Sequence, residues 1–135
     1  MTIRNSTLSG NSSPNAGDIV NFGDSGTATV TIGSTIIKAG SSSSIANSDG
    51  TVTSLGYNLS SDGGVTNSGS GTGALNATGD QTSTNPMLGP LGYYGGPTAT
   101  HILQPGSPAI DKGNNFTSAT TDQRGPGFVL SLIHI

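Results

Sequence analysis

Hydrophobic and polar residues alternate in parts of the first half of the chain. Residues 28–32 read ATVTI, which places alanine, valine and isoleucine on one side and threonine on the other. This period of two predicts a strand with one buried face. Clusters of serine, glycine and asparagine in residues 9–18 and 41–44 predict tight turns between such strands. The pattern indicates short strands joined by turns over residues 1–62.

One phrase recurs within this region. Residues 3–8 read IRNSTL, and residues 32–37, which start 29 positions after residue 3, read IGSTII. A weaker copy, LGYNL in residues 55–59, starts 23 positions after residue 32. Repeats of this length are typical of solenoids, in which each coil buries its apolar face only against its neighbours. We therefore predict two to three stacked coils in residues 1–62.

Three asparagines of this region, Asn11, Asn47 and Asn58, allow two interpretations. They could point inward and stack as a ladder of side chains from coil to coil. Asparagine is also common in surface turns, where it tolerates a left-handed backbone. We expect the surface interpretation for each of them.

The chain changes character after residue 62. Residues 63–84 hold few apolar residues and predict a loop or a weak coil, with room for short strands at Val65 and Leu75. Six of the seven prolines follow within residues 85–129, where they break long strands. Extended segments and turns are therefore expected there.

Composition narrows the classes of fold and function. Gly, Ser, Thr and Asn occupy 71 of the 135 positions, and the net charge is −3. These four residue types occupy the positions that helix-forming residues would need, which excludes a helical bundle or a coiled coil. Only four residues are basic, so nucleic-acid binding is not expected. Leu, Ile, Val and Phe make up 27 of the 135 residues, which leaves disorder as the alternative to a turn-rich β fold.

Four ordered motifs lie in the last third of the chain. They are NPMLGPL at 85–91, GGPTATH at 95–101, GSPAIDKG at 106–113 and TDQRGPGF at 121–128. Together they resemble the choice-of-anchor Q domain of bacterial surface proteins, and the similarity extends back through the coils. The resemblance implies the closing part of a right-handed parallel β-helix, with residues 85–129 as an irregular C-terminal cap.

The resemblance also implies a large exported protein located at the cell surface or outside the cell. Residues 1–6 lack the layout of a secretion signal, no stretch approaches a membrane helix, and no anchoring signal is visible. We expect further coils and the signal upstream, and the anchor downstream. Residues 130–135 (LSLIHI) resemble the translation of a transposon end used in sequencing libraries, so we interpret them as an artefact.

A cap has a physical task in such a fold. The last coil of a solenoid exposes unpaired strand edges and an open apolar core, and a terminal unit that covers them prevents association. Seven apolar residues are expected to fill that end: Met87, Leu88, Leu91, Ile102, Leu103, Ile110 and Phe128.

Four polar residues stand out as candidate site residues. We expect structural roles for all of them and assign no catalytic, cofactor-binding or metal-ligating residue. The imidazole of His101 is expected to hold a turn by bonding the backbone. The carboxylate of Asp111 is placed to cap a turn, and Arg124 can pair with either Asp111 or Asp122.

We predict a structural or adhesin-like segment that is not an enzyme and needs no cofactor. The first alternative is a polysaccharide lyase or hydrolase, since such enzymes also use parallel β-helices, although the acids expected in turns do not gather on one sheet face. A carbohydrate-binding module that recognises surface polysaccharide is the second. Calcium binding between Asp18 and Asp24 stays open, because oxygen-rich loops suit Ca²⁺.

Overall fold

The computed structural model describes residues 1–13, 17–24 and 27–129, so the interpretation of residues 130–135 lies outside the described residues. Within these ranges the chain is all-β and holds no helix suited to crossing a membrane. The strands are β1 (Thr2–Arg4), β2 (Thr7–Ser9), β3 (Ile19–Phe22), β4 (Thr29–Gly33), β5 (Ile36–Lys38), β6 (Ile45–Ser48), β7 (Thr51–Gly56), β8 (Leu59–Ser60), β9 (Val65–Ser68), β10 (Thr72–Gly73), β11 (Leu88–Gly92) and β12 (Thr100–Leu103).

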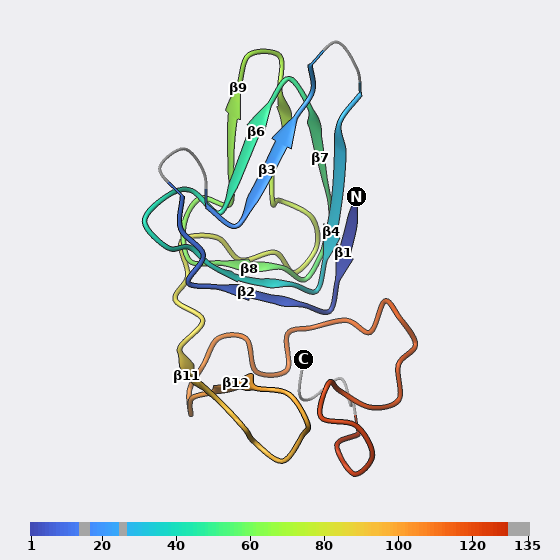
Figure 1. The fold of residues 1–135 in the computed structure, drawn as a ribbon. Helices are drawn as coiled ribbons and strands as arrows, with labels where there is room; N and C mark the ends of the chain where they lie inside the picture. The colour runs from blue at the N-terminus through green and yellow to red at the C-terminus, as the bar shows by residue number, and fades with distance from the viewer. Residues whose placement is uncertain (14–16, 25–26, 130–135) are drawn as a thin grey trace.

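Three parallel sheets form the main body of the molecule. Their strand orders are β1-β4-β7-β10, β2-β5-β8 and β3-β6-β9, so the chain visits each sheet in turn. Each round of three strands makes one coil, and Figure 1 shows the coils stacked behind one another around a three-sided outline. This stacking of parallel sheets is consistent with a β-solenoid, as the sequence predicts.

The register of the strands confirms the first repeat and corrects part of the second. Ile3 pairs with Ile32, 29 positions later, as the repeated phrase requires. Ile32 in turn pairs with Ser54, and a register shift follows before Gly33 meets Gly56. Leu55 is therefore the extra residue of a bulge, and the prediction that it repeats Ile32 is wrong.

The core consists of aliphatic side chains stacked from coil to coil. Val30 and Ile32 are 2% and 0% exposed whereas Thr29 is exposed, which confirms the predicted one-sided strand. Such β-branched residues suit a pleated surface that is half covered. The buried core cluster contains Ile19, Val30, Ile32, Ile37, Ile45, Val52 and Leu75.

One corner of each of the three coils holds a non-glycine residue in the left-handed conformation. Asn5, Ser34 and Tyr57 have φ of 48°, 48° and 59°, and each lies between the first two strands of its coil. Each backbone N–H donates to a carbonyl one coil further along, at 2.9–3.2 Å. The corner residues thus form a row along the stack, with one side chain per coil.

Residues 63–84 continue the stack. Val65 lies in β9 and pairs with Ile45, and β10 pairs with β7. Leu75 belongs to no strand, but its side chain is 6% exposed and packs into the core cluster. An isolated parallel β-bridge also pairs Leu59 with Gln81.

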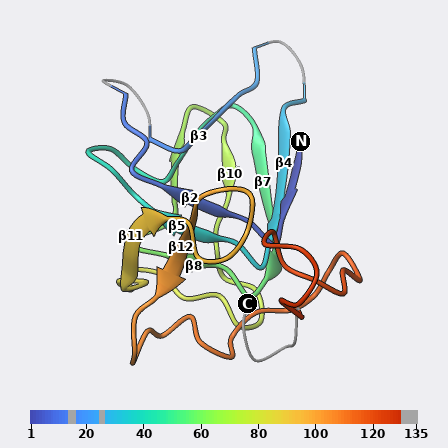
Figure 2. The same cartoon turned by 60° about the horizontal axis from the view of Figure 1, so that its bottom comes forward.

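Residues 85–129, the C-terminal segment, lie beside the stack. They run along the outer side of the β2-β5-β8 sheet, and β11 and β12 pair antiparallel there (Figures 1 and 2). That outer side carries an apolar residue, Leu59. Its side chain is 3% exposed although it does not belong to the core cluster, so the C-terminal segment covers it. The segment therefore buries side chains on the flank of the stack.

This position corrects the predicted filling of the coil end. Leu91, Ile102 and Ile110 are 62%, 49% and 37% exposed, so they fill no apolar core. Leu88 is buried, at 9% exposed, and Met87, Leu103 and Phe128 are half-buried. At that end of the stack Leu75 packs on the core in place of these residues.

Candidate functional site

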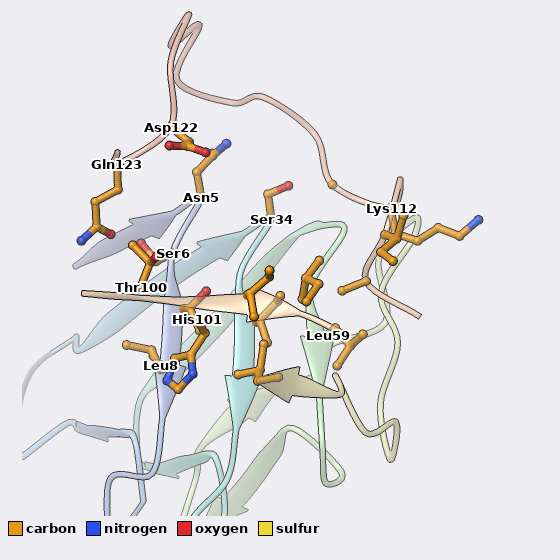
Figure 3. Close-up of a pocket in the computed structure, with 18 of the residues that line it drawn as sticks. Asn5, Ser6, Leu8, Ser34, Leu59, Thr100, His101, Lys112, Asp122 and Gln123 are labelled. Atoms are coloured by element: carbon orange, nitrogen blue, oxygen red, sulfur yellow. The ribbon is translucent and has the colours of Figure 1, made fainter. Parts of the chain in front are cut away.

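A groove separates the outer side of the β2-β5-β8 sheet from the C-terminal segment. Its cavity volume is about 1130 Å³. Figure 3 shows Leu59 on the sheet side and His101 on the opposite side, with Asn5 and Ser34 at the corner. The four candidate residues His101, Asp111, Asp122 and Arg124 all line it. The structure thus brings together residues that are separated in the sequence.

Three contacts hold the C-terminal segment to the corner row. The backbone N–H of Asn114 donates to Ser34 Oγ at 2.5 Å, and the amide of Asn5 donates to the carbonyl of Asn114 at 3.4 Å. The rings of Tyr57 and Phe116 meet edge to face, with centroids 6.2 Å apart. Such a ring pair stabilises by about 1 kcal/mol beyond the area it buries. The groove is therefore closed on one side by a specific attachment.

His101 lies on β12 and bonds the neighbouring chain. Its Nδ1 is 2.8 Å from the carbonyl oxygen of Gly89. Because a carbonyl only accepts hydrogen bonds, Nδ1 carries the proton in this contact. The contact bridges β12 and the irregular stretch of β11 between Leu88 and Leu91, where the pairing register shifts. The imidazole thus ties the antiparallel pair at its irregular point.

Arg124 pairs with Asp122, one of the two carboxylates considered for it. Arg124 Nη2 lies 2.6 Å from Asp122 Oδ2, and Nε donates to both carboxylate oxygens. These hydrogen bonds hold the pKa of Arg124 above its ordinary value. The guanidinium also lies 4.1 Å from the centroid of the Phe128 ring. The pair therefore shapes the final loop of the C-terminal segment.

Asp111 contributes through its backbone. Its φ is 62°, the left-handed conformation of a turn residue. Among the residues that the structure describes, its carboxylate makes no hydrogen bond and no ion pair, either with Arg124 or with a turn N–H. The side chain is exposed at the rim of the groove.

The sequence analysis missed the apolar outer side of the sheet that forms one wall of the groove. Ile36 and Ile37 are consecutive in β5, so their side chains point to opposite faces. Ile37 is fully buried in the core, and Ile36 lines the groove. Two adjacent isoleucines in a strand are the signal that both faces are covered, and this signal was available from the sequence.

A second polar feature runs along the stack from the first coil to the third. The amide of Asn21 donates to Asn47 Oδ1 at 2.8 Å, and the amide of Asn47 donates to Asn67 Oδ1 at 2.7 Å. These three residues, in register on β3, β6 and β9, form a ladder of stacked amides. Asn47 is 1% exposed, so the surface interpretation is wrong for it.

Asn58 is also buried, whereas Asn11 is exposed. The Asn58 carbonyl oxygen accepts from the Thr35 N–H at 3.0 Å, and its amide donates to Asp80 Oδ1 at 3.0 Å. Asn11 donates to Asp18 Oδ1 at 2.7 Å near the surface. The surface interpretation therefore holds for Asn11 and is wrong for Asn58.

Asp62 and Asp18 are partly buried carboxylates of the stack with shifted pKa values. Burial acts to raise the pKa of Asp62, but hydrogen bonds from Ser44 and Ser60 and from the N–H groups of Ser44 and Gly64 lower it overall. Burial raises the pKa of Asp18, against the hydrogen bond from Asn11, and the nearby charge of Asp62 adds to the rise. The pKa values of the two carboxylates are thus shifted in opposite directions, because Asp62 accepts more hydrogen bonds than Asp18.

Comparison with family models, with curated proteins and with solved structures found no match for this chain.

Proposed function

We propose that this chain is a structural, adhesin-like segment of an exported bacterial cell-surface protein. In this proposal the stack is the end of a right-handed parallel β-helix, and the C-terminal segment precedes the anchor. The resemblance of residues 85–128 to the choice-of-anchor Q domain supports it. The parallel sheets and the absence of repeated acids along one sheet face of the described residues support a scaffold rather than an enzyme.

The observation that carries the proposal is the difference between the two ends of the stack. Ile3 and Leu8 in the first coil are half-buried, although Ile32 and Ile37, which pair with them in the second coil, are both 0% exposed. Inward residues of a terminal coil lose half of their surroundings when no further coil covers them. The first coil therefore has the properties of an interior coil whose neighbour lies elsewhere in a longer protein.

The opposite end of the stack is covered in part by the chain itself. Leu75 packs on the core there, whereas Val65 of β9 stays half-buried. The carboxylate of Asp80 accepts hydrogen bonds from Ser54, from the Asn58 backbone and from the Ala77 backbone. An open first coil and a partly covered last coil fit a segment that ends a β-helix.

The location of the parent protein tests this proposal. Its full reading frame would be recovered with long reads, tagged within the exposed turn at residues 105–106, and expressed in the source bacterium. We expect antibody labelling of intact cells and loss of the signal after protease treatment of the cell surface. Labelling that requires lysed cells would contradict an exported structural segment.

The groove favours a second candidate, a non-catalytic site for surface polysaccharide. Its walls combine the Tyr57 ring with hydroxyl and amide groups from Ser6, Thr100 and Gln123, the mixture that sugars require. Titration with neutral and acidic oligosaccharides, with and without Ca²⁺, would be followed by NMR shifts of His101. Unsaturated products or new reducing ends in the same samples would favour the lyase or hydrolase instead.

A further inference from the structure

The strands β1, β2 and β3 form the first-coil edge, which is unpaired within the described part of the chain. Each of these strands pairs on one side only, with β4, β5 and β6 respectively. Exposed strand edges bind another strand unless something blocks them. The side chains stacked behind this edge indicate what would cover it.

The apolar part of the edge needs one more layer. Ile3 and Leu8 pack on the core cluster from the edge side but stay partly exposed. The residues in register with them one coil further, Ile32 and Ile37, are completely buried. A covering coil would complete this burial with aliphatic side chains at the two matching positions.

The asparagine ladder adds a direction to the edge. Each amide nitrogen in the ladder donates to the Oδ1 of the following coil, from Asn21 to Asn47 and from Asn47 to Asn67. Each Oδ1 therefore accepts from the coil before it. The Oδ1 of Asn21 accepts no hydrogen bond from any described residue. The ladder thus ends at the first coil with an acceptor that lacks its donor.

We infer that the first-coil edge binds a parallel β-coil that carries an asparagine in register with Asn21. This inference rests on the proposed function. The amide nitrogen of the incoming asparagine donates to Asn21 Oδ1, and aliphatic residues of the same coil cover Ile3 and Leu8. A second copy of the chain related by a two-fold axis would bring two Asn21 acceptors face to face and would leave the ladder without a donor.

A chain lengthened by one coil tests this inference. A second copy of residues 31–52 would be placed directly before Thr2. Thr2 pairs with Thr31, and Thr31 pairs with Thr53, so this copy has the length of one coil and sets its own Asn47 over Asn21. The matched control carries the same extension with Asn47→Leu in the copied residues only.

Amide hydrogen exchange of β1 and β3 is the readout. We expect both extensions to slow exchange relative to the original chain, because both cover Ile3 and Leu8. The extension with asparagine should slow it about tenfold more than the leucine control, the effect of one buried hydrogen bond. Melting temperatures should follow the same order.

The possible outcomes separate the ladder from the proposed function. Equal protection by the two extensions would overturn the asparagine requirement and leave the β-helix proposal standing. Unchanged exchange with both extensions would overturn both. Protection of β1–β3 in the original chain that increases with protein concentration would assign the edge to a second copy and overturn the parallel coil.

Discussion

The coil stack and the C-terminal segment bury their side chains in different ways. In the stack, equivalent residues of successive coils lie over one another, so Ile32, Ile37 and Ile45 are 0% exposed. In the segment, Leu91 and Tyr93 are 62% and 77% exposed, and attachment depends on a few contacts such as the Tyr57–Phe116 ring pair. Repetition thus yields a core from few aliphatic residues, whereas a single unrepeated segment depends on the surface to which it binds.

The largest difference should follow from truncation of an inward isoleucine. Ile37→Ala removes a fully buried side chain and leaves a cavity between coils. We expect a loss of about 3 kcal/mol in the free energy of unfolding. Leu91→Ala in the exposed part of the segment should change it by less than about 0.5 kcal/mol. Urea denaturation followed by circular dichroism measures both, and equal losses would remove the distinction between the two regions.

The buried polar contacts of the stack should come next. Asn58→Ala removes the acceptor of the Thr35 N–H and a donor to Asp80 in the interior. We expect a loss of about 2 kcal/mol, since unpaired buried groups are costly. The exposed Asn76→Ala is the matched control and should be close to neutral. If the two variants unfold at the same urea concentration, the interior role of Asn58 is wrong.

Acid should affect the stack through Asp62. The folded pKa of Asp62 is lowered, so its stabilising contribution is present above the unfolded pKa of about 3.9 and is lost as pH falls through the folded value. Asp18 has a raised folded pKa, so its contribution is present below the unfolded pKa and is lost as pH rises. We expect Asp62→Asn to flatten the acid side of the stability curve, and Asp18→Asn to stabilise the protein at neutral pH.

Thermal unfolding across pH 2–8 measures these changes. The wild-type melting temperature should fall at the acid end more steeply than that of Asp62→Asn. Identical acid slopes for the two proteins would contradict the role of the Ser44 and Ser60 hydrogen bonds.

The smallest effect is expected in the final loop. The Arg124 and Asp122 side chains are 31% and 24% exposed, and ion pairs near the surface contribute less than about 1 kcal/mol. Arg124→Ala should lower the melting temperature only slightly while hydrogen exchange of residues 121–129 accelerates. Arg124→Lys keeps the charge but loses the bidentate geometry. Its exchange rate should lie between those of the wild type and Arg124→Ala. An unchanged exchange rate in Arg124→Ala would contradict a stabilising role of the Arg124–Asp122 pair in this loop.

The repeated strands were predictable because their residues repeat the same environment. Ile3 and Ile32 share a neighbourhood, so similar residues recur at a regular distance. The bulge at Leu55 was not predictable, since an extra residue in one strand leaves no mark in the hydrophobic pattern. The local sequence likewise does not separate Asn47, which points inward, from Asn11, which lies at the surface, because the position within the coil decides between them.

The candidate site was predictable only in part. The pairing of Arg124 with Asp122 spans two residues and depends on local geometry. The groove depends on where residues 85–129 attach, which no periodic pattern specifies. Residues 85–129 were expected to cover the open end of the last coil, as terminal units of solenoids do. They attach instead to the apolar outer side of the sheet at Ile36 and Leu59.

The most direct test of this account is the position of the C-terminal segment relative to the stack. Nuclear Overhauser effects would be measured between the ring protons of Phe116 and those of Tyr57 in the intact chain. Clear cross-peaks are expected from this pair, whose ring centroids are 6.2 Å apart. Cross-peaks from Phe116 to Ile3 or Leu75 in place of Tyr57 would show the segment across an end of the stack and would contradict it.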